Sequence, residues 1–132
     1  MEAYELTLSE PLALQDTPEG HLWLTVMYEA FEDLRSVAEW MPQHVPLGPT
    51  PRPTNLKGSR RARMRDQARR AASVIEFFLD NPESTLGWIC DLFDYDEHVM
   101  RKIAADEIEE NRIRERLKRA EEWLAEGSLS PL

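Results

Sequence analysis

Apolar residues recur at steps of three and four along most of this chain, which is the spacing of one face of an α-helix. The first such face follows Thr17 and Pro18, where a capping side chain precedes a proline suited to the first helical position. It predicts a helix over about 17–41, ending at Met41 because Pro42 follows. Its apolar residues are Trp23, Val26, Met27, Ala30, Phe31, Leu34, Val37, Ala38 and Met41.

Residues 42–58 interrupt this pattern with five prolines and two glycines. Such a composition predicts an extended linker without regular structure, either packed on the rest of the chain or mobile. A second helix is expected from a cap at Ser59 to the break at Asn81 and Pro82. Its apolar face comprises Met64, Ala68, Ala71, Ala72, Ile75, Phe78 and Leu79.

Two shorter helices should follow, one from Ser84 or Thr85 to about Phe93 and one capped by Asp96. Only Asp94 and Tyr95 separate them, which predicts a tight turn with Asp94 near the left-handed conformation. The residues expected to be buried between the two helices are Ile89, Cys90, Phe93, Met100 and Ile103.

The sequence ESTLGWICDLFDYDEHVMRKI, which carries these two helices, resembles the small helix-turn-helix proteins, often phage-encoded, that share a motif with sigma factor region 4. The resemblance covers roughly residues 60–104. It implies DNA binding in transcription control. The exposed recognition-helix positions would be Asp96, Glu97, His98, Arg101 and Lys102, of which His98, Arg101 and Lys102 are candidate DNA contacts. The chain departs from the pattern in having Asp94 where glycine is usual and in its acidic start to the recognition helix.

The C-terminal stretch ADEIEENRIRERLKRAEEWLAEG predicts one long, exposed helix that ends at Gly127. Glu110 and Arg114, and likewise Glu115 and Arg119, are spaced to pair along it. Its narrow apolar stripe either packs on the same chain or joins two subunits of a homodimer. The N-terminal helix is the rival dimerisation element. The candidate interface residues are Trp23, Phe31 and Trp40 on the N-terminal helix, and Ile113, Leu117 and Leu124 on the stripe.

These expectations amount to an all-α fold: a helix-turn-helix core with a long N-terminal helix and a long charged C-terminal helix. The organisation along the chain would be an N-terminal segment and amphipathic helix (1–41), a proline-rich linker (42–58), a helix-turn-helix domain (59–110) and a C-terminal helix and tail (111–132).

Charge is distributed unevenly along the chain. The formal net charge is −9, yet residues 52–70 hold eight bases and one acid. So many cations at a helix N-terminus oppose the helix dipole. This arrangement is explained either by an anionic partner or by pairing with the acidic N-terminal third of the chain. In the first case, the phosphate contacts would be Arg60, Arg61, Arg63, Arg65 and Arg69.

Other classes of function find less support in the sequence. No apolar run is long enough to cross a membrane and the N-terminus lacks a basic leader, so a soluble, cytoplasmic protein is expected. Cys90, Asp94, Asp96 and His98 could in principle bind a metal, but one cysteine and three histidines are too few for a typical zinc site. No catalytic motif is present. We therefore expect neither a cofactor nor an enzymatic activity.

Three functions remain as hypotheses. The first is a transcription regulator that binds double-stranded DNA. The second is an acidic protein-binding module that modulates a host transcription or defence protein, because the acids near the recognition helix would oppose contact with phosphates. The third and weaker one is a small terminase-like DNA-packaging subunit. The acids in question are Asp91, Asp94, Asp96 and Glu97.

Overall fold

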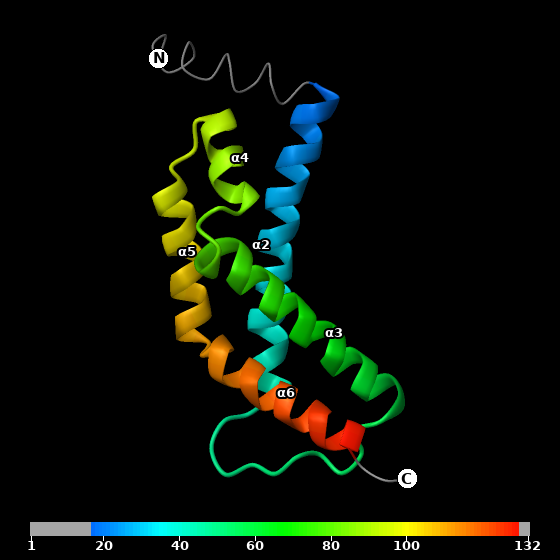
Figure 1. The fold of residues 1–132 in the computed structure, drawn as a ribbon. Helices are drawn as coiled ribbons and strands as arrows, with labels where there is room; N and C mark the ends of the chain where they lie inside the picture. The colour runs from blue at the N-terminus through cyan, green and yellow to red at the C-terminus, as the bar shows by residue number, and fades with distance from the viewer. Residues whose placement is uncertain (1–16, 130–132) are drawn as a thin grey trace.

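The computed structural model describes residues 17–129, so the prediction for the first sixteen residues lies outside the described part. Within that part the chain is helical and contains no strand, which confirms the all-α class (Figure 1). The elements are α2 (Pro18–His44), α3 (Gly58–Ile75), the π-helical turn η1 (Glu76–Asp80), α4 (Thr85–Phe93), α5 (Glu97–Glu110) and α6 (Ile113–Leu129).

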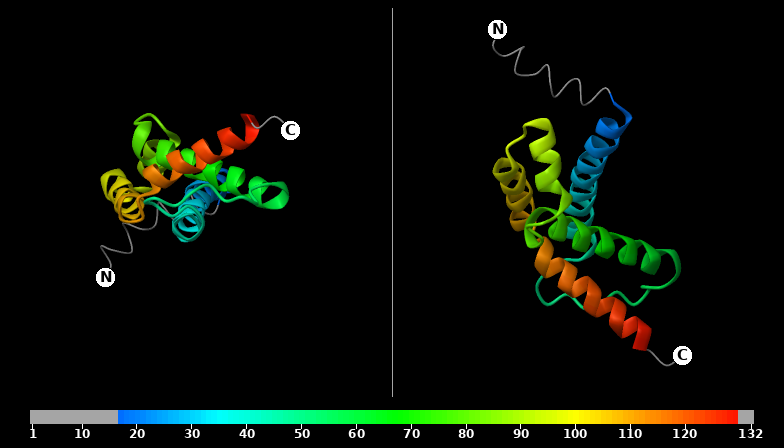
Figure 2. Two further views of the ribbon diagram at one scale, coloured as in Figure 1. Left: turned by 90° about the horizontal axis from the view of Figure 1, so that it is seen from below. Right: turned by 45° about the horizontal axis from the view of Figure 1, so that its top comes forward.

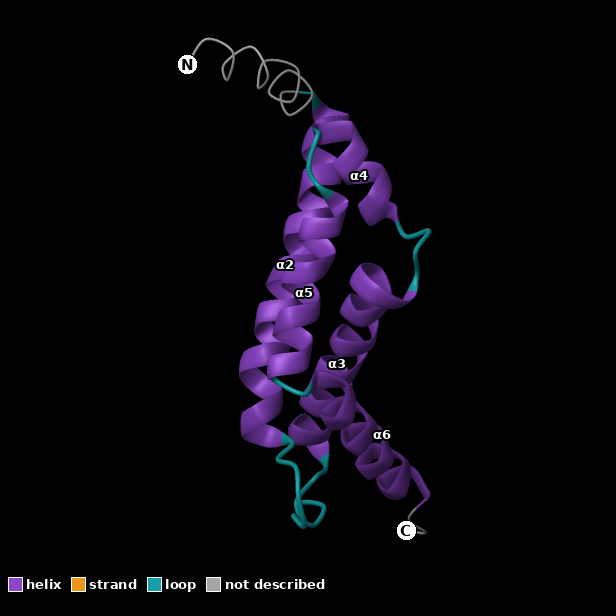
Figure 3. Cartoon of the chain, turned by 90° about the vertical axis from the view of Figure 1, so that its left-hand side faces the viewer, coloured by secondary structure: helices purple, strands orange, loops and turns teal. Residues whose placement is uncertain are grey.

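Helices α2 and α5 pack against each other and form the long axis of the molecule, with α4 at one end (Figures 1 and 3). Helix α3 crosses α2, and α6 packs on α3 (Figure 2). A single hydrophobic core takes residues from all of these elements. Its most deeply buried members include Val37, Met41, Ala71, Phe78, Leu86, Ile89, Phe93, Ala104, Ile108, Ile113 and Ala120.

Helix α2 begins as predicted and ends later than predicted. The Thr17 hydroxyl accepts a hydrogen bond of 2.9 Å from the Gly20 backbone N–H, which makes Thr17 the N-cap. The helix then continues past Pro42 to His44. Met41 and Val45 are both fully buried, and the Val45 N–H donates to the Met41 carbonyl at 2.8 Å. Core packing thus holds the last turn in place despite the proline.

The proline-rich segment between α2 and α3 is ordered against α6. Arg116 donates to the Val45 carbonyl at 2.8 Å, and Arg119 donates to the carbonyls of Pro46 and Gly48 at 2.5 and 2.6 Å. In the opposite direction, Arg52 of the segment donates to the Trp123 carbonyl of α6 at 2.8 Å. The segment has no regular structure, as predicted, but these arginines fix its path. Helix α3 then begins at Gly58, before the predicted cap at Ser59, and Lys57 at its N-cap makes no side-chain cap.

The prediction of one exposed C-terminal helix is wrong. The helix breaks at Asn111 and Arg112, where Arg112 has a φ of 51°. After the break, α6 continues through Gly127 to Leu129. The break separates Glu110 from Arg114, which instead forms a two-pronged hydrogen bond with Asp80 at 2.7 and 3.1 Å. Of the two alternatives for the apolar stripe, packing on the same chain holds for Ile113 and Ala120, which are fully buried, and the neighbouring Trp123 is buried too.

The prediction that Ile103 is buried between α4 and α5 is also wrong, because the residue is 52% exposed. The inner face of α5 is instead formed by Met100, Ala104 and Ile108, which lie four residues apart. Residues at that spacing share one face of a helix, so Ile103 is directed away from the core. The other residues expected between α4 and α5 pack as predicted, since Ile89, Cys90 and Phe93 are buried and Met100 is partly buried.

Candidate nucleic-acid interface

The turn between α4 and α5 has the backbone geometry that the sequence predicts. Asp94 adopts φ 58° and ψ 39°, the left-handed conformation, and the Tyr95 N–H donates to the Cys90 carbonyl at 2.8 Å. Asp96 caps α5, since its carboxylate accepts hydrogen bonds from the N–H groups of His98 at 2.9 Å and Val99 at 3.2 Å. The chain turns back sharply between the two helices (Figure 1).

A side-chain network then locks α5 to its neighbours. Arg101 donates to the Glu97 carboxylate at 2.8 Å and to the backbone carbonyl of Phe78 at 2.6 Å. Glu97 in turn lies over Gly87 of α4, where a Cβ atom would come within 3.0 Å of its Oε1. Gly87 therefore gives the Glu97 side chain the room it needs to reach Arg101. The Arg101–Glu97 ion pair lies within α5, and its two members contact the neighbouring elements: Arg101 bonds to η1 and Glu97 lies against α4.

This network engages Arg101, one of the predicted DNA contacts, within the fold. Its side chain is only 19% exposed and is bound to Phe78 and Glu97, so it is not at an exposed recognition position. The sequence could not reveal this, because the acceptor is a backbone carbonyl on a distant element. Of the predicted contacts on α5, His98 and Lys102 remain exposed, and Lys102 pairs with Asp106 at 3.2 Å.

The outward face of α5 is therefore poor in free positive charge. Beside His98 and Lys102, it presents the apolar side chains of Val99 and Ile103, which are 46% and 52% exposed. Near its N-terminal end lie the exposed acids Asp94 and Asp96. These groups would meet a phosphate backbone unfavourably.

The exposed arginines of α3 are freer than the cations of α5, and they lie on two sides of the helix, Arg60 and Arg63 on one and Arg65 and Arg69 on the other. Arg60, Arg63, Arg65 and Arg69 are exposed, and none of them donates to an acceptor within residues 17–129. Arg65 and Arg69 lie four residues apart and share one outward face of the helix. Arg61 differs from them because it donates to the Leu124 carbonyl at 2.8 Å. We name the four exposed residues, Arg60, Arg63, Arg65 and Arg69, the α3 arginine cluster.

Pairing with acids of the N-terminal third accounts for little of this charge. Within the described part of that third, Asp33 approaches Arg70 at 4.0 Å, and Arg70 also pairs with Asp66 of its own helix at 3.3 Å. Arg70 is not a member of the cluster. The first turns of α3 lie at the far end of that helix from the α4–α5 turn (Figure 1). The arginines in the first turns of α3, Arg60 and Arg63, therefore do not lie beside His98 and Lys102.

The residues predicted for a dimer interface contact their own chain. The Trp23 and Trp88 rings meet edge to face at 4.5 Å, Phe31 lies 4.7 Å from Phe78, and Trp40 stacks on His44. Ile113 is fully buried, so it is not available to a second subunit. Leu117 and Leu124 are partly buried against the core. Most of the apolar surface that suggested dimerisation is therefore used within the protomer.

Two titratable groups near the turn have raised pKa values. Burial raises the pKa of the Cys90 thiol, and the charge of Glu97 raises it further, so the neutral thiol is favoured. Burial also raises the pKa of Tyr95, with a smaller contribution from Tyr28. In the described residues no three His, Cys, Asp or Glu side chains are placed to hold a metal ion. None of the described helices is long and apolar enough to span a bilayer.

The sequence reasoning missed a cavity that adjoins the α3 arginine cluster. It lies between the end of α2 and the start of α3, and Arg60 and Arg63 line it together with Trp40 and His44. The sequence does indicate the stacked wall, because Trp40 and His44 are one helical turn apart on α2, but it favours Trp40 as a residue of a dimer interface.

Comparison with known proteins yields no relative. No family model, curated protein or solved structure matches this chain, so the likeness to sigma region 4 rests on the quoted residues alone.

Proposed function

We propose that this protein binds double-stranded DNA in transcription control, and that the α3 arginine cluster supplies its main phosphate contacts. The observation that carries this proposal is the exposure of four arginines without an acceptor in residues 17–129, in a chain whose net charge is −9. The other cations of residues 52–70 include Arg52, Arg61 and Arg70, which have partners in the fold.

The position of Arg60 in the first turn of α3 strengthens this proposal. The first turn of α3 contains no acidic residue, and cations there oppose the helix dipole. An arrangement that costs stability in the free protein is understandable if a phosphate backbone neutralises it in the complex. In this proposal α4 and α5 act as the helix-turn-helix, with His98 and Lys102 as the recognition-helix contacts.

The experiment is a fluorescence anisotropy titration of a labelled duplex at two salt concentrations. Replacing Arg65 and Arg69 by glutamine should weaken binding to all sequences alike, and should lower the salt slope by about 0.9 for each phosphate that the variant no longer neutralises. The control is Lys118→Gln, which removes an exposed charge from α6. Absence of binding at low salt, or an equally weakened control, would overturn the proposal.

A second candidate, a protein-binding module, is favoured by the outward face of α5. Val99 and Ile103 are exposed one turn apart, and the start of the helix beside them is acidic. An apolar pair within an acidic border suits a partner protein better than it suits DNA. Under this hypothesis, Val99→Ser with Ile103→Ser would abolish a protein complex and leave any DNA affinity unchanged.

A further inference from the structure

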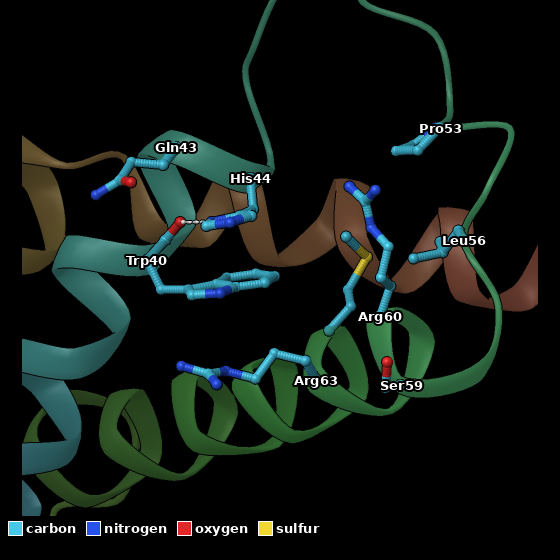
Figure 4. Close-up of a pocket in the computed structure, with 9 residues that line it drawn as sticks. Trp40, Gln43, His44, Pro53, Leu56, Ser59, Arg60 and Arg63 are labelled. Carbon is cyan, nitrogen blue, oxygen red and sulfur yellow. Dashed lines mark hydrogen bonds between the residues drawn. The ribbon is translucent and has the colours of Figure 1, made fainter.

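The cavity at the α2–α3 junction has a volume of about 510 Å³ and is open to solvent. Its walls come from three parts of the chain: the last turns of α2, the proline-rich segment and the first turns of α3 (Figure 4). Pockets of this size commonly hold small molecules. The lining residues are Trp40, Gln43, His44, Pro53, Leu56, Ser59, Arg60, Arg63 and Met64.

One wall of the cavity is aromatic and held in place. The rings of Trp40 and His44 stack with centroids 4.2 Å apart and planes 8° from parallel. The His44 Nδ1 lies 3.0 Å from the Trp40 carbonyl, which fixes the imidazole over the indole. Such a rigid pair offers a flat surface on which another planar ring can stack.

The opposite wall is cationic. Figure 4 shows Arg63 on the other side of the Trp40 indole from His44, and Arg60 rising between Leu56 and the aromatic pair. Neither guanidinium donates to an acceptor in the described residues, and no acidic residue lines this cavity. A neighbouring hollow of about 310 Å³ shares Trp40 and Arg63 but is also lined by Glu32 and Glu39. An anion would therefore be drawn to the Arg60 side.

We propose that this cavity binds a nucleotide, with the planar base against the Trp40–His44 pair and the phosphate at the Arg60 guanidinium. The two walls match the two parts of a nucleotide, a flat ring and an anion, and arginine suits phosphate because it can donate two parallel hydrogen bonds. The nucleotide could be free or could be the 5′-phosphorylated end of a strand. The site shares Arg60 and Arg63 with the proposed DNA surface but does not depend on duplex binding.

The test uses the indole N–H signals of the full chain in a proton–nitrogen correlation spectrum. The four tryptophans give four signals, and Trp40→Phe assigns one of them. Titration with AMP should shift the Trp40 signal most strongly, and adenosine or inorganic phosphate alone should bind more weakly than AMP. No shift of the Trp40 signal by AMP at millimolar concentration would overturn the proposal.

Arg60→Gln should weaken AMP binding by about tenfold, which is the expected loss of a charged hydrogen bond, and Arg63→Gln should weaken it less. Lys118→Gln should leave AMP binding unchanged, and equal weakening by this control would overturn the proposal. A 5′-phosphorylated trinucleotide that binds more tightly than AMP identifies a strand end, whereas weaker binding identifies the free nucleotide. Duplex affinity is measured separately. AMP binding without duplex binding would therefore contradict the proposed DNA-binding function and support the nucleotide site.

Discussion

Arg101 donates a hydrogen bond of 2.6 Å to the backbone carbonyl of Phe78, and this contact joins the first half of α5 to the middle of η1. The same guanidinium holds Glu97 at 2.8 Å. A basic side chain in a helix-turn-helix pattern would ordinarily be assigned to DNA. Here it satisfies a carbonyl near the irregular end of a helix, so its main role is in the fold.

Replacing Arg101 by alanine should therefore destabilise the protein. Because the Phe78 carbonyl and the Glu97 carboxylate both lose a charged donor, we expect a loss of about 1.5 to 3 kcal/mol in the free energy of unfolding. Lys102→Ala, which removes an exposed pair with Asp106, should cost less than about 1 kcal/mol. Urea denaturation of both variants measures the difference. Equal stability of the two variants would contradict the structural role of Arg101 and make it a candidate DNA contact again.

The inner face of α5 gives a second prediction. Ile108 is 1% exposed, so Ile108→Ala should cost about 2 to 5 kcal/mol. Ile103→Ala removes an exposed side chain and should change stability by less than about 0.5 kcal/mol. Thermal and chemical denaturation of the pair test this assignment of faces. A large loss from Ile103→Ala in a monomer would contradict it.

The sequence predicts those features of the fold that depend on local interactions, and it does not predict those that depend on tertiary packing. The caps at Thr17 and Asp96 and the left-handed Asp94 were predictable because each depends on a side chain acting within a few residues of itself. The break at Asn111 and Arg112 was not, because no proline or glycine marks it and good helix formers surround it. Tertiary packing of Ile113 and its neighbours accompanies the bend.

The candidate site was predictable only in part, for a related reason. Counting charges identified the basic block of residues 52–70, but it could not separate arginines that bind distant carbonyls from arginines that remain exposed. Arg52 and Arg61 reach backbone oxygens of α6, whereas Arg65 and Arg69 remain exposed. That distinction depends on three-dimensional neighbours, which periodicity does not report.

The Asp80–Arg114 pair gives a prediction on pH. The hydrogen bond from Arg114 lowers the pKa of Asp80 below its ordinary value of 3.8. Because the folded-state pKa is the lower one, the pair stabilises the protein above the unfolded pKa, and this contribution is lost as the pH falls through the folded value. Both side chains are about half exposed, so the effect should be small. Thermal melts from pH 6 to pH 2 should therefore show a slightly shallower acid decline for Asp80→Asn than for the wild type.

The clamp between α6 and the proline-rich segment gives the last prediction. Arg119 binds the carbonyls of Pro46 and Gly48, and its guanidinium also lies 5.7 Å from the centre of the Trp123 ring. Arg119→Gln cannot keep both charged bonds, so residues 46–57 should lose their fixed path while α2 and α5 stay folded. Limited proteolysis should show faster cleavage confined to that segment. The matched control is Lys118→Gln, a change at the neighbouring residue that breaks no hydrogen bond to the segment.

Because the same segment supplies Pro53 and Leu56 to the nucleotide cavity, Arg119→Gln should also weaken AMP binding without touching the ligand. Unchanged cleavage in residues 46–57 would mean that proline stiffness and the burial of Leu56 hold the segment without the clamp.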